Sequence, residues 1–152
     1  MIGDDDALEA MPAFVERAAR ELGEAAARRK PSGGAFSLVE HAWHLADLER
    51  EGFGERIERL LHETEPQLAD FDGDRAARER RYVTLPLDEA LAAFRRARAQ
   101  NLRALRSLPA SDWSRGGTQE GVGRVTLRDL PRLMAEHDDS HRREIEDLLA
   151  RR

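Results

Sequence analysis

The sequence predicts an all-α four-helix bundle that occupies residues 1–152 as a single domain. Apolar residues recur at helical spacing in four separate stretches of the chain. Ala, Leu, Arg and Glu are abundant, whereas aromatic residues make up only 5% of the sequence. Alanine and straight-chain residues lose little conformational entropy in a helix, so this mixture favours helix over sheet.

The first helix is expected over residues 5–29. Pro12 lies inside this stretch, so the helix is expected either to begin or to bend there. The run Lys30-Pro31-Ser32-Gly33-Gly34 should end it. The residues predicted to face the core share one side of the helix and are Leu8, Met11, Val15, Ala18 and Leu22.

The second helix is expected to begin at Ser37, which forms a Ser-x-x-Glu capping box with Glu40, and to end near His62. A polar connection over residues 64–84, rich in Asp and Arg, follows it. Such a long connection is unusual in a compact bundle, so we expect it to be functional or partly helical. The core contacts expected from this helix are Leu38, Leu45, Leu48, Phe53, Ile57 and Leu60.

The third helix is expected to begin near Pro86, with Asp88 and Glu89 in its first turn, where acids suit the helix dipole. Arg98 is a charged exception in its otherwise apolar stripe, which consists of Leu87, Leu91, Phe94, Leu102 and Leu105. Residues 109–124 contain Trp113 and four glycines and are predicted to form an ordered loop, with Trp113 packed over the end of the bundle.

The fourth helix is expected to follow Thr126, with Asp129 three residues later and Pro131 close to the start. Its predicted core stripe contains two histidines and reads Leu127, Leu130, Met134, His137, His141, Ile145 and Leu148. Histidines four residues apart lie above one another on a helix, with Cβ atoms about 5–6 Å apart. They form a chelating pair for a divalent ion of the zinc or nickel type. The alternative is a pair of buried histidines satisfied by hydrogen bonds.

A third ligand must come from another helix, and the second helix offers His41 and His44. Both are expected near the edge of the core stripe, so the spacing does not choose between them. His62 lies near the end of the same helix and is expected to be exposed.

Three motifs resemble the DinB/YfiT-like superfamily in their order along nearly the whole chain. The first is Phe36-Ser37-Leu38-Val39-Glu40-His41-Ala42-Trp43-His44-Leu45-Ala46-Asp47. The second is the loop Trp113-Ser114-Arg115-Gly116-Gly117 with Gly121-x-Gly123-x-Val125-Thr126-Leu127. The third is His137-Asp138-x-x-His141. Phe36 departs from the pattern, because many members carry Trp there, and Pro131 is a second departure.

The resemblance implies an up-and-down-type bundle with a three-histidine metal site, often in a homodimer. The family ligand on the second helix is the histidine immediately before a leucine, which is His44 here. His137 and His141 match the two ligands on the last helix, and His41 becomes a neighbour that could line the pocket. The resemblance also implies a small-molecule substrate and, in some members, transfer to or from a low-molecular-weight thiol.

Three neutral imidazoles leave open positions on a divalent ion, which could support hydrolysis or activate a thiolate. The chain has no cysteine, so a thiol would have to arrive as a cosubstrate. Asp47, one turn after His44, is a candidate catalytic or orienting group, and Arg115 is a candidate for binding an anionic substrate. Asp138 and Glu51 are expected on solvated faces. The alternative function is a non-catalytic metal-binding bundle that serves structure or dimerisation.

Composition excludes other classes of function. The formal net charge of -5 argues against nucleic-acid binding, which needs a basic face. The absence of cysteine excludes disulfides, thiolate metal sites and a cysteine nucleophile. No apolar run approaches the roughly 18 residues needed to span a bilayer, and the acidic start MIGDDDALEA has the wrong charge for a signal peptide. We therefore expect a soluble cytoplasmic protein with no membrane partner.

Overall fold

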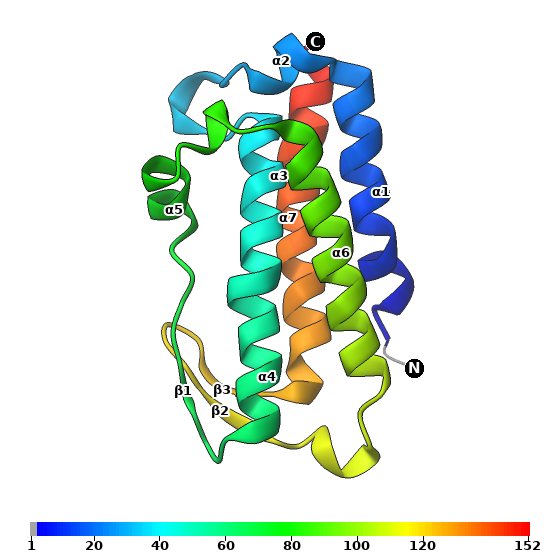
Figure 1. The fold of residues 1–152 in the computed structure, drawn as a ribbon, viewed down its shortest axis with the longest axis vertical. Coiled ribbons are helices and arrows are strands. Elements are labelled where there is room, and N and C mark those ends of the chain that lie inside the picture. The colour runs from blue at the N-terminus through cyan, green and yellow to red at the C-terminus, as the bar shows by residue number, and fades with distance from the viewer. Residues whose placement is uncertain (1–2) are drawn as a thin grey trace.

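Four helical rods lie side by side in the computed structural model, which describes residues 3–152 (Figure 1). The rods are α1 (Asp5–Leu22), α3 (Leu38–Asp47) with its continuation, α6 (Leu87–Arg106) and α7 (Leu130–Ala150). Helix α3 packs against α6, and α1 packs against both α6 and α7. The predicted all-α four-helix bundle is confirmed.

The first helix is shorter than expected. Helix α1 begins at Asp5, before Pro12, and ends at Leu22, and a separate short helix α2 (Glu24–Arg28) follows. Gly23 separates them with a φ of 79°, a left-handed conformation that glycine adopts without the steric cost of a Cβ. The prediction of a continuous helix over residues 5–29 is therefore wrong at Gly23.

The second rod keeps its predicted limits but changes its winding midway. Helix α3 begins with the capping box: Ser37 Oγ accepts from the Glu40 amide, and the Glu40 carboxylate accepts from the Ser37 amide. A π-helical turn, η2 (Leu48–Gly54), then joins α3 to α4 (Glu55–His62). Asn101 Nδ2 donates to the backbone carbonyl of Glu49 over 2.9 Å and so satisfies a carbonyl in the irregular turn.

Two of the connections between the rods contain regular secondary structure. Residues 64–84 contain β1 (Gln67–Leu68), the helix α5 (Gly73–Glu79) and the 3₁₀ turn η3 (Tyr82–Thr84), which confirms that this connection is partly helical. Residues 109–124 contain the 3₁₀ turn η4 (Ala110–Asp112), strand β2 (Gly116–Gln119) and the start of β3 (Gly123–Thr126), so the prediction of a plain ordered loop was wrong.

The three strands form one small sheet in the order β1-β2-β3. Strand β1 pairs in parallel with β2, with Gln67 opposite Thr118, and β2 pairs antiparallel with β3. Gly121 and Gly123 in and beside the turn have positive φ, which suits glycine. Strands this short show no alternation of apolar and polar residues, which is why the sequence pattern did not reveal them.

The fourth rod starts as predicted. Thr126 and Asp129 form a capping box around the 3₁₀ turn η5 (Leu127–Asp129), and Pro131 lies in the first turn of α7, where its missing N–H is not needed.

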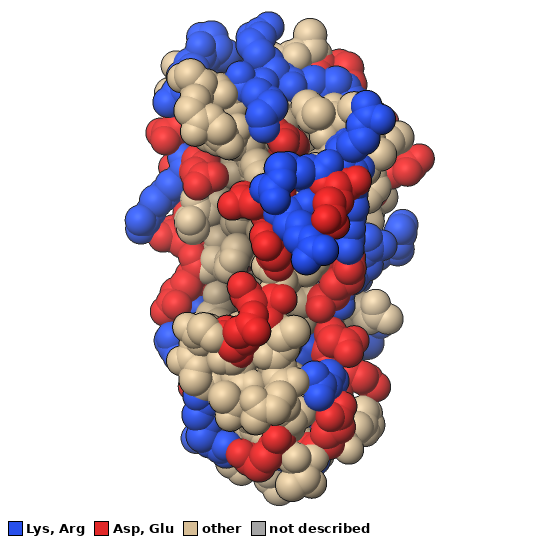
Figure 2. Space-filling model, turned by 90° about the vertical axis from the view of Figure 1, so that its left-hand side faces the viewer, with Lys and Arg blue, Asp and Glu red and all other residues tan. Residues whose placement is uncertain are grey.

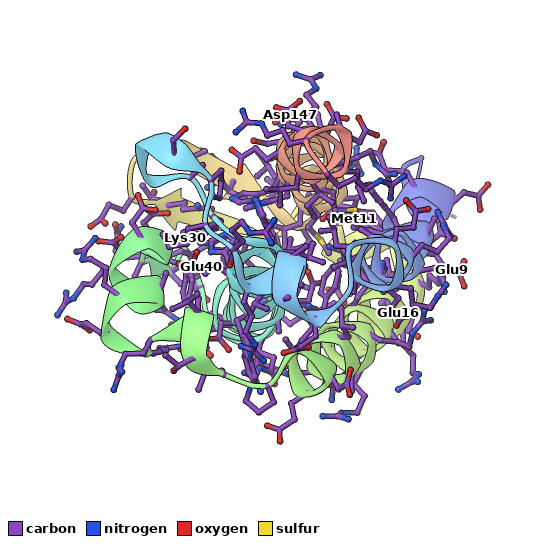
Figure 3. The ribbon with its side chains drawn as sticks, turned by 90° about the horizontal axis from the view of Figure 1, so that it is seen from above. Glu9, Met11, Glu16, Lys30, Glu40 and Asp147 are labelled. Atoms are coloured by element: carbon purple, nitrogen blue, oxygen red, sulfur yellow. The ribbon has the colours of Figure 1, made fainter. Side chains whose placement is uncertain are left out.

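Seen from above, Met11 of α1 points toward the core between α1 and α7, while the α5 segment lies outside the bundle (Figure 3). Trp113 packs against the apolar cluster at the end of the bundle, as expected. Within residues 3–152, no helix has both the length and the apolar character to cross a membrane.

Candidate metal centre

Three histidines meet between two rods of the bundle. His44 comes from α3, and His137 and His141 come from successive turns of α7. One ligating atom of each lies within 4.8 Å of the others. Their ring centroids are 4.7 Å apart for His44 and His141, 5.1 Å for the pair on α7, and 5.8 Å for His44 and His137. The structure thus brings together the three residues predicted as metal ligands.

The three imidazoles are held in their neutral form. His44 is 6% exposed and His141 is 8% exposed. Burial disfavours the charged ring and, with the neighbouring histidines, lowers the pKa of His44 to about 4 and that of His141 to about 2. Burial also lowers the pKa of His137. A neutral imidazole offers the lone pair that a metal ion needs.

Two nitrogens of this cluster lack the partners that buried polar atoms normally have. Among the described residues, the Nδ1 atoms of His44 and His137 are buried and have no hydrogen-bond partner. Leaving such atoms unsatisfied costs free energy, and an unsatisfied group in a native protein points to a missing ligand. The donor set, three neutral imidazoles, fits a divalent ion of the zinc or nickel type.

His41 extends the cluster away from the three ligands. It is 1% exposed, its Nδ1 lies 2.9 Å from Nδ1 of His141, and its Nε2 lies 3.3 Å from the Glu144 carboxylate. Burial lowers the pKa of His41 to about 3, so this ring is neutral and carries one proton. With that proton on Nε2, which faces the Glu144 carboxylate, Nδ1 would accept a hydrogen bond from His141. His141 is then left with a free lone pair on Nε2, as expected of a ligand oriented by its neighbours.

A pocket of about 760 Å³ opens in front of the histidines. Phe36 and Phe71 lie beside His44, with ring centroids 5.7 and 6.0 Å from its own. The other lining residues are Gly34, Ala35, Asp70, Asp72, Gly73, Asp74, Glu120, His137, Ser140, His141 and Glu144. A small molecule that enters this pocket therefore reaches the three histidines.

Asp47 does not line the pocket. Its buried carboxylate accepts from Tyr82 Oη and from the guanidinium groups of Arg50 and Arg80. Burial alone would raise the pKa of Asp47, but these hydrogen bonds lower it overall. The contacts tie the α5–η3 segment to α3, so Asp47 supports the wall that carries Phe71 and Gly73. Its catalytic role stays a prediction.

Among the other candidate polar residues, Arg115 lies away from the pocket, whereas Glu51 and His62 lie on the surface as expected. Arg115 Nε donates to the Leu60 carbonyl over 2.8 Å at the end of α4, so the structure does not bring Arg115 to the pocket. Glu51 is exposed and pairs with Arg80, as expected for a solvated face. His62 is also exposed, with a side-chain exposure of 68%.

Asp138 is buried, so the expectation that it lies on a solvated face was wrong. It is 7% exposed and receives two hydrogen bonds from Arg98, which also pairs with the buried Glu49. A buried guanidinium needs negatively charged partners. Arg98, the charged residue in the apolar stripe of the third helix, was therefore the sequence signal that acids on neighbouring helices would be buried with it.

The acidic residues of the pocket were missed by the sequence analysis. Asp70, Asp72 and Asp74 come from the 64–84 connection, and Glu120 comes from the turn between β2 and β3. The unusual length of the connection was the only signal that it could be functional.

Gly73 leaves space for the His44 ring. A Cβ at this position would lie 2.3 Å from Cε1 and 2.6 Å from Nδ1 of His44, closer than real Cβ contacts. Gly73→Ala is therefore expected to displace the ring and to weaken zinc binding by about tenfold, the lower end of the effect of disturbing a ligand's orientation. A competition titration with a chelating dye measures it. Gly3→Ala, with no atom within 4 Å of the new Cβ, is the control; equal affinities in both variants would contradict the prediction.

The neutral histidines also make the metal-free protein sensitive to acid. An unfolded histidine, with its ordinary pKa of 6.5, takes up protons as the pH falls, whereas folded His41, His44 and His141 stay neutral down to about pH 4 or below. Stability is thus present above pH 6.5 and is lost as the pH falls. Between pH 7 and pH 6 the expected loss is about 0.7 kcal/mol for each ring, or about 2 kcal/mol in all.

Urea unfolding of the metal-free protein at the two pH values measures this loss. His62→Gln should leave it unchanged, because that side chain is exposed. A free energy of unfolding that is equal at pH 7 and pH 6 would show that the histidines are not held neutral.

Comparisons with known proteins identify the family and the fold of this chain. A sequence profile described as the DinB superfamily matches residues 7–145. YfiT from Bacillus subtilis, described as a probable metal-dependent hydrolase with an unusual four-helix bundle topology, has a similar structure, with a TM-score of 0.86. The two are 21% identical, and the match covers 97% of this chain and 85% of that chain. No curated protein matches the sequence significantly.

Proposed function

Because this chain belongs to the DinB superfamily, we propose that it is a metal-dependent enzyme that hydrolyses a small molecule, with His44, His137 and His141 as the ligands of one divalent ion. The observation that carries the proposal is the set of three neutral imidazoles, two of them buried and the third half-buried, at the wall of an open pocket; the Nδ1 atoms of His44 and His137 are unpartnered. YfiT, which shares the fold, is described as a probable metal-dependent hydrolase.

An ion held by three neutral imidazoles would keep open positions, polarise a bound carbonyl or phosphoryl group and lower the pKa of a water molecule. The protein's own residues supply the rest. His41 orients His141 through the hydrogen bond between their Nδ1 atoms, and the Glu144 carboxylate lies 3.3 Å from Nε2 of His41. Phe36 and Phe71 reduce the access of water around His44. Glu144 lines the pocket, and burial together with nearby acids raises the pKa of its carboxyl, so it is suited to accept a proton near the substrate.

Hydrolysis is favoured over thiol transfer by the charge of the pocket. Its lining includes five carboxylate side chains and neither lysine nor arginine. A thiol cosubstrate that carries a net negative charge would be repelled on approach, whereas water is not. Transfer to or from a low-molecular-weight thiol is the second candidate, supported by the capacity of such an ion to deprotonate a thiol. Zinc or nickel is the proposed metal, because imidazole ligands suit both. A homodimer is also part of the proposal, and light scattering would measure it.

The test is a panel of small ester, amide and phosphoester substrates, assayed with the metal-stripped protein and after reloading with zinc or nickel. Activity should appear only after reloading and should be absent in His44→Ala. The same preparations assayed with a thiol and an electrophile test the second candidate. Zinc-loaded protein that is inactive in both panels, but melts at a higher temperature than the stripped protein, would favour the non-catalytic alternative.

A further inference from the structure

The pocket in front of the histidines is lined by acids from three separate parts of the chain. Asp70, Asp72 and Asp74 lie on the segment that leads into α5, Glu120 on the β2–β3 turn, and Glu144 on α7. Figure 2 looks onto the face that carries α5 and the strands, and acidic side chains gather near the middle of that face. Neither lysine nor arginine lines this pocket. A divalent ion would offset only part of the charge, so the pocket would remain anionic.

These acids differ from most others in the chain in lacking a basic partner. Arginines pair with acids over much of the surface, as in Arg75 with Glu79 and Arg95 with Glu16. Within residues 3–152, none of the five pocket acids has a lysine or arginine nitrogen within 4.0 Å, and Glu144 pairs only with His41. Mutual repulsion of unpaired carboxylates costs stability, which a positively charged ligand would relieve.

A second observation points to a ligand at the same site. His44 is 6% exposed, lines the pocket and has an unpartnered Nδ1. The aromatic rings of Phe36 and Phe71 beside it supply an apolar wall, and aromatic faces also attract cations. The pocket lining therefore combines histidines, two aromatic rings beside His44 and five acids without a lysine or arginine partner.

We propose that the substrate of this site is a small organic cation whose ammonium group is held by the pocket carboxylates while its apolar part contacts Phe36 and Phe71. The proposal rests on the proposed function for the position of the reacting group. The cation preference depends only on the five acids and the two aromatic rings.

Three matched probes test the preference: 2-phenylethylamine, which is cationic at pH 7, neutral 2-phenylethanol and anionic phenylacetate. Each is titrated by NMR into the zinc-loaded protein, with zinc content measured in the same samples. The amine should bind at least about tenfold more tightly than the alcohol, a difference of about 1.4 kcal/mol. Phenylacetate should bind most weakly, and added salt should reduce the binding of the amine.

The matched variant is the triple substitution Asp70→Asn, Asp74→Asn and Glu120→Gln. It leaves Asp72, which caps α5, and Glu144, which contacts His41, in place. It should weaken amine binding at least about threefold, because each partly exposed charge pair contributes a modest free energy. The control removes three exposed acids outside the pocket by Glu55→Gln, Asp88→Asn and Glu89→Gln, and should bind the amine like the wild type.

Equal binding of amine and alcohol, or tighter binding of phenylacetate, would overturn the cation proposal while leaving the zinc site untouched. A second equivalent of zinc that competes with the amine and is lost in the pocket variant would also overturn it, because the acids would then hold a metal ion. If the protein takes up no zinc but still prefers the amine, the proposed function fails and the cation preference stands.

Discussion

Replacing His137 and His141 together with alanine is expected to abolish stoichiometric binding of zinc or nickel. The two residues supply two of the three neutral imidazoles that converge between α3 and α7, so the double variant leaves His44 alone. Disturbing the residues that only orient a ligand lowers metal affinity about 10- to 100-fold, so losing two ligands should exceed that range. Isothermal titration of the stripped protein, with elemental analysis after dialysis, measures the loss.

His62→Ala is the matched control for this experiment. His62 is an exposed histidine on α4 that pairs with Glu58 and lies away from the cluster, so its loss should leave one equivalent of metal bound. Circular dichroism must show the same helix content in all the variants. A folded double variant that still binds one equivalent with wild-type affinity would show that the metal lies elsewhere.

The second large effect is expected at the buried charge cluster behind the metal centre. Arg98→Met should lower the free energy of unfolding by about 3–5 kcal/mol, because Glu49 and Asp138 would be left as unpaired buried charges. Methionine keeps most of the side-chain volume, so the loss is electrostatic rather than a cavity effect. Urea unfolding at pH 7 measures it.

Arg95→Met is the matched control one turn away on the same helix. Arg95 pairs with Glu16 at the surface, and removing an exposed pair should cost less than about 1 kcal/mol. If the two substitutions cost the same, the buried cluster is not stabilised by the arginine. If Arg98→Met is more stable than the wild type, the apolar replacement outweighs the ion pairs.

Helical spacing was sufficient to predict the bundle and two of the three histidines of the candidate metal centre. Histidines 137 and 141 occupy core positions of an apolar stripe, and a period of 3.6 residues places them on one face without knowledge of the rest of the fold. The spacing did not choose between His41 and His44. In the structure both are buried, and they differ in what they contact: His44 lines the pocket, whereas His41 is hydrogen-bonded to His141 and lies 3.3 Å from the Glu144 carboxylate.

The remaining parts of the site depend on contacts between segments that are distant in the sequence. No local sequence pattern predicts such contacts. Gly73 lies against His44, and the hydrogen bond from Tyr82 to Asp47 helps to hold the α5 segment near α3. Glu120 reaches the pocket because the strand pairing of β1 with β2 brings the hairpin beside that segment. Arg98 could be recognised in the sequence as a charged residue in an apolar stripe, but its partners on two other helices could be identified only from the fold.

The most direct test of the metal centre is anomalous diffraction from a crystal of the zinc-loaded protein, measured on both sides of the zinc absorption edge. One peak within about 2.0–2.1 Å of a nitrogen of each of His44, His137 and His141 is the predicted result. A peak instead between His41, His141 and Glu144, which also have ligating atoms within 4.8 Å of one another, would contradict the assignment. So would the absence of any peak at these histidines in protein that carries one equivalent of zinc.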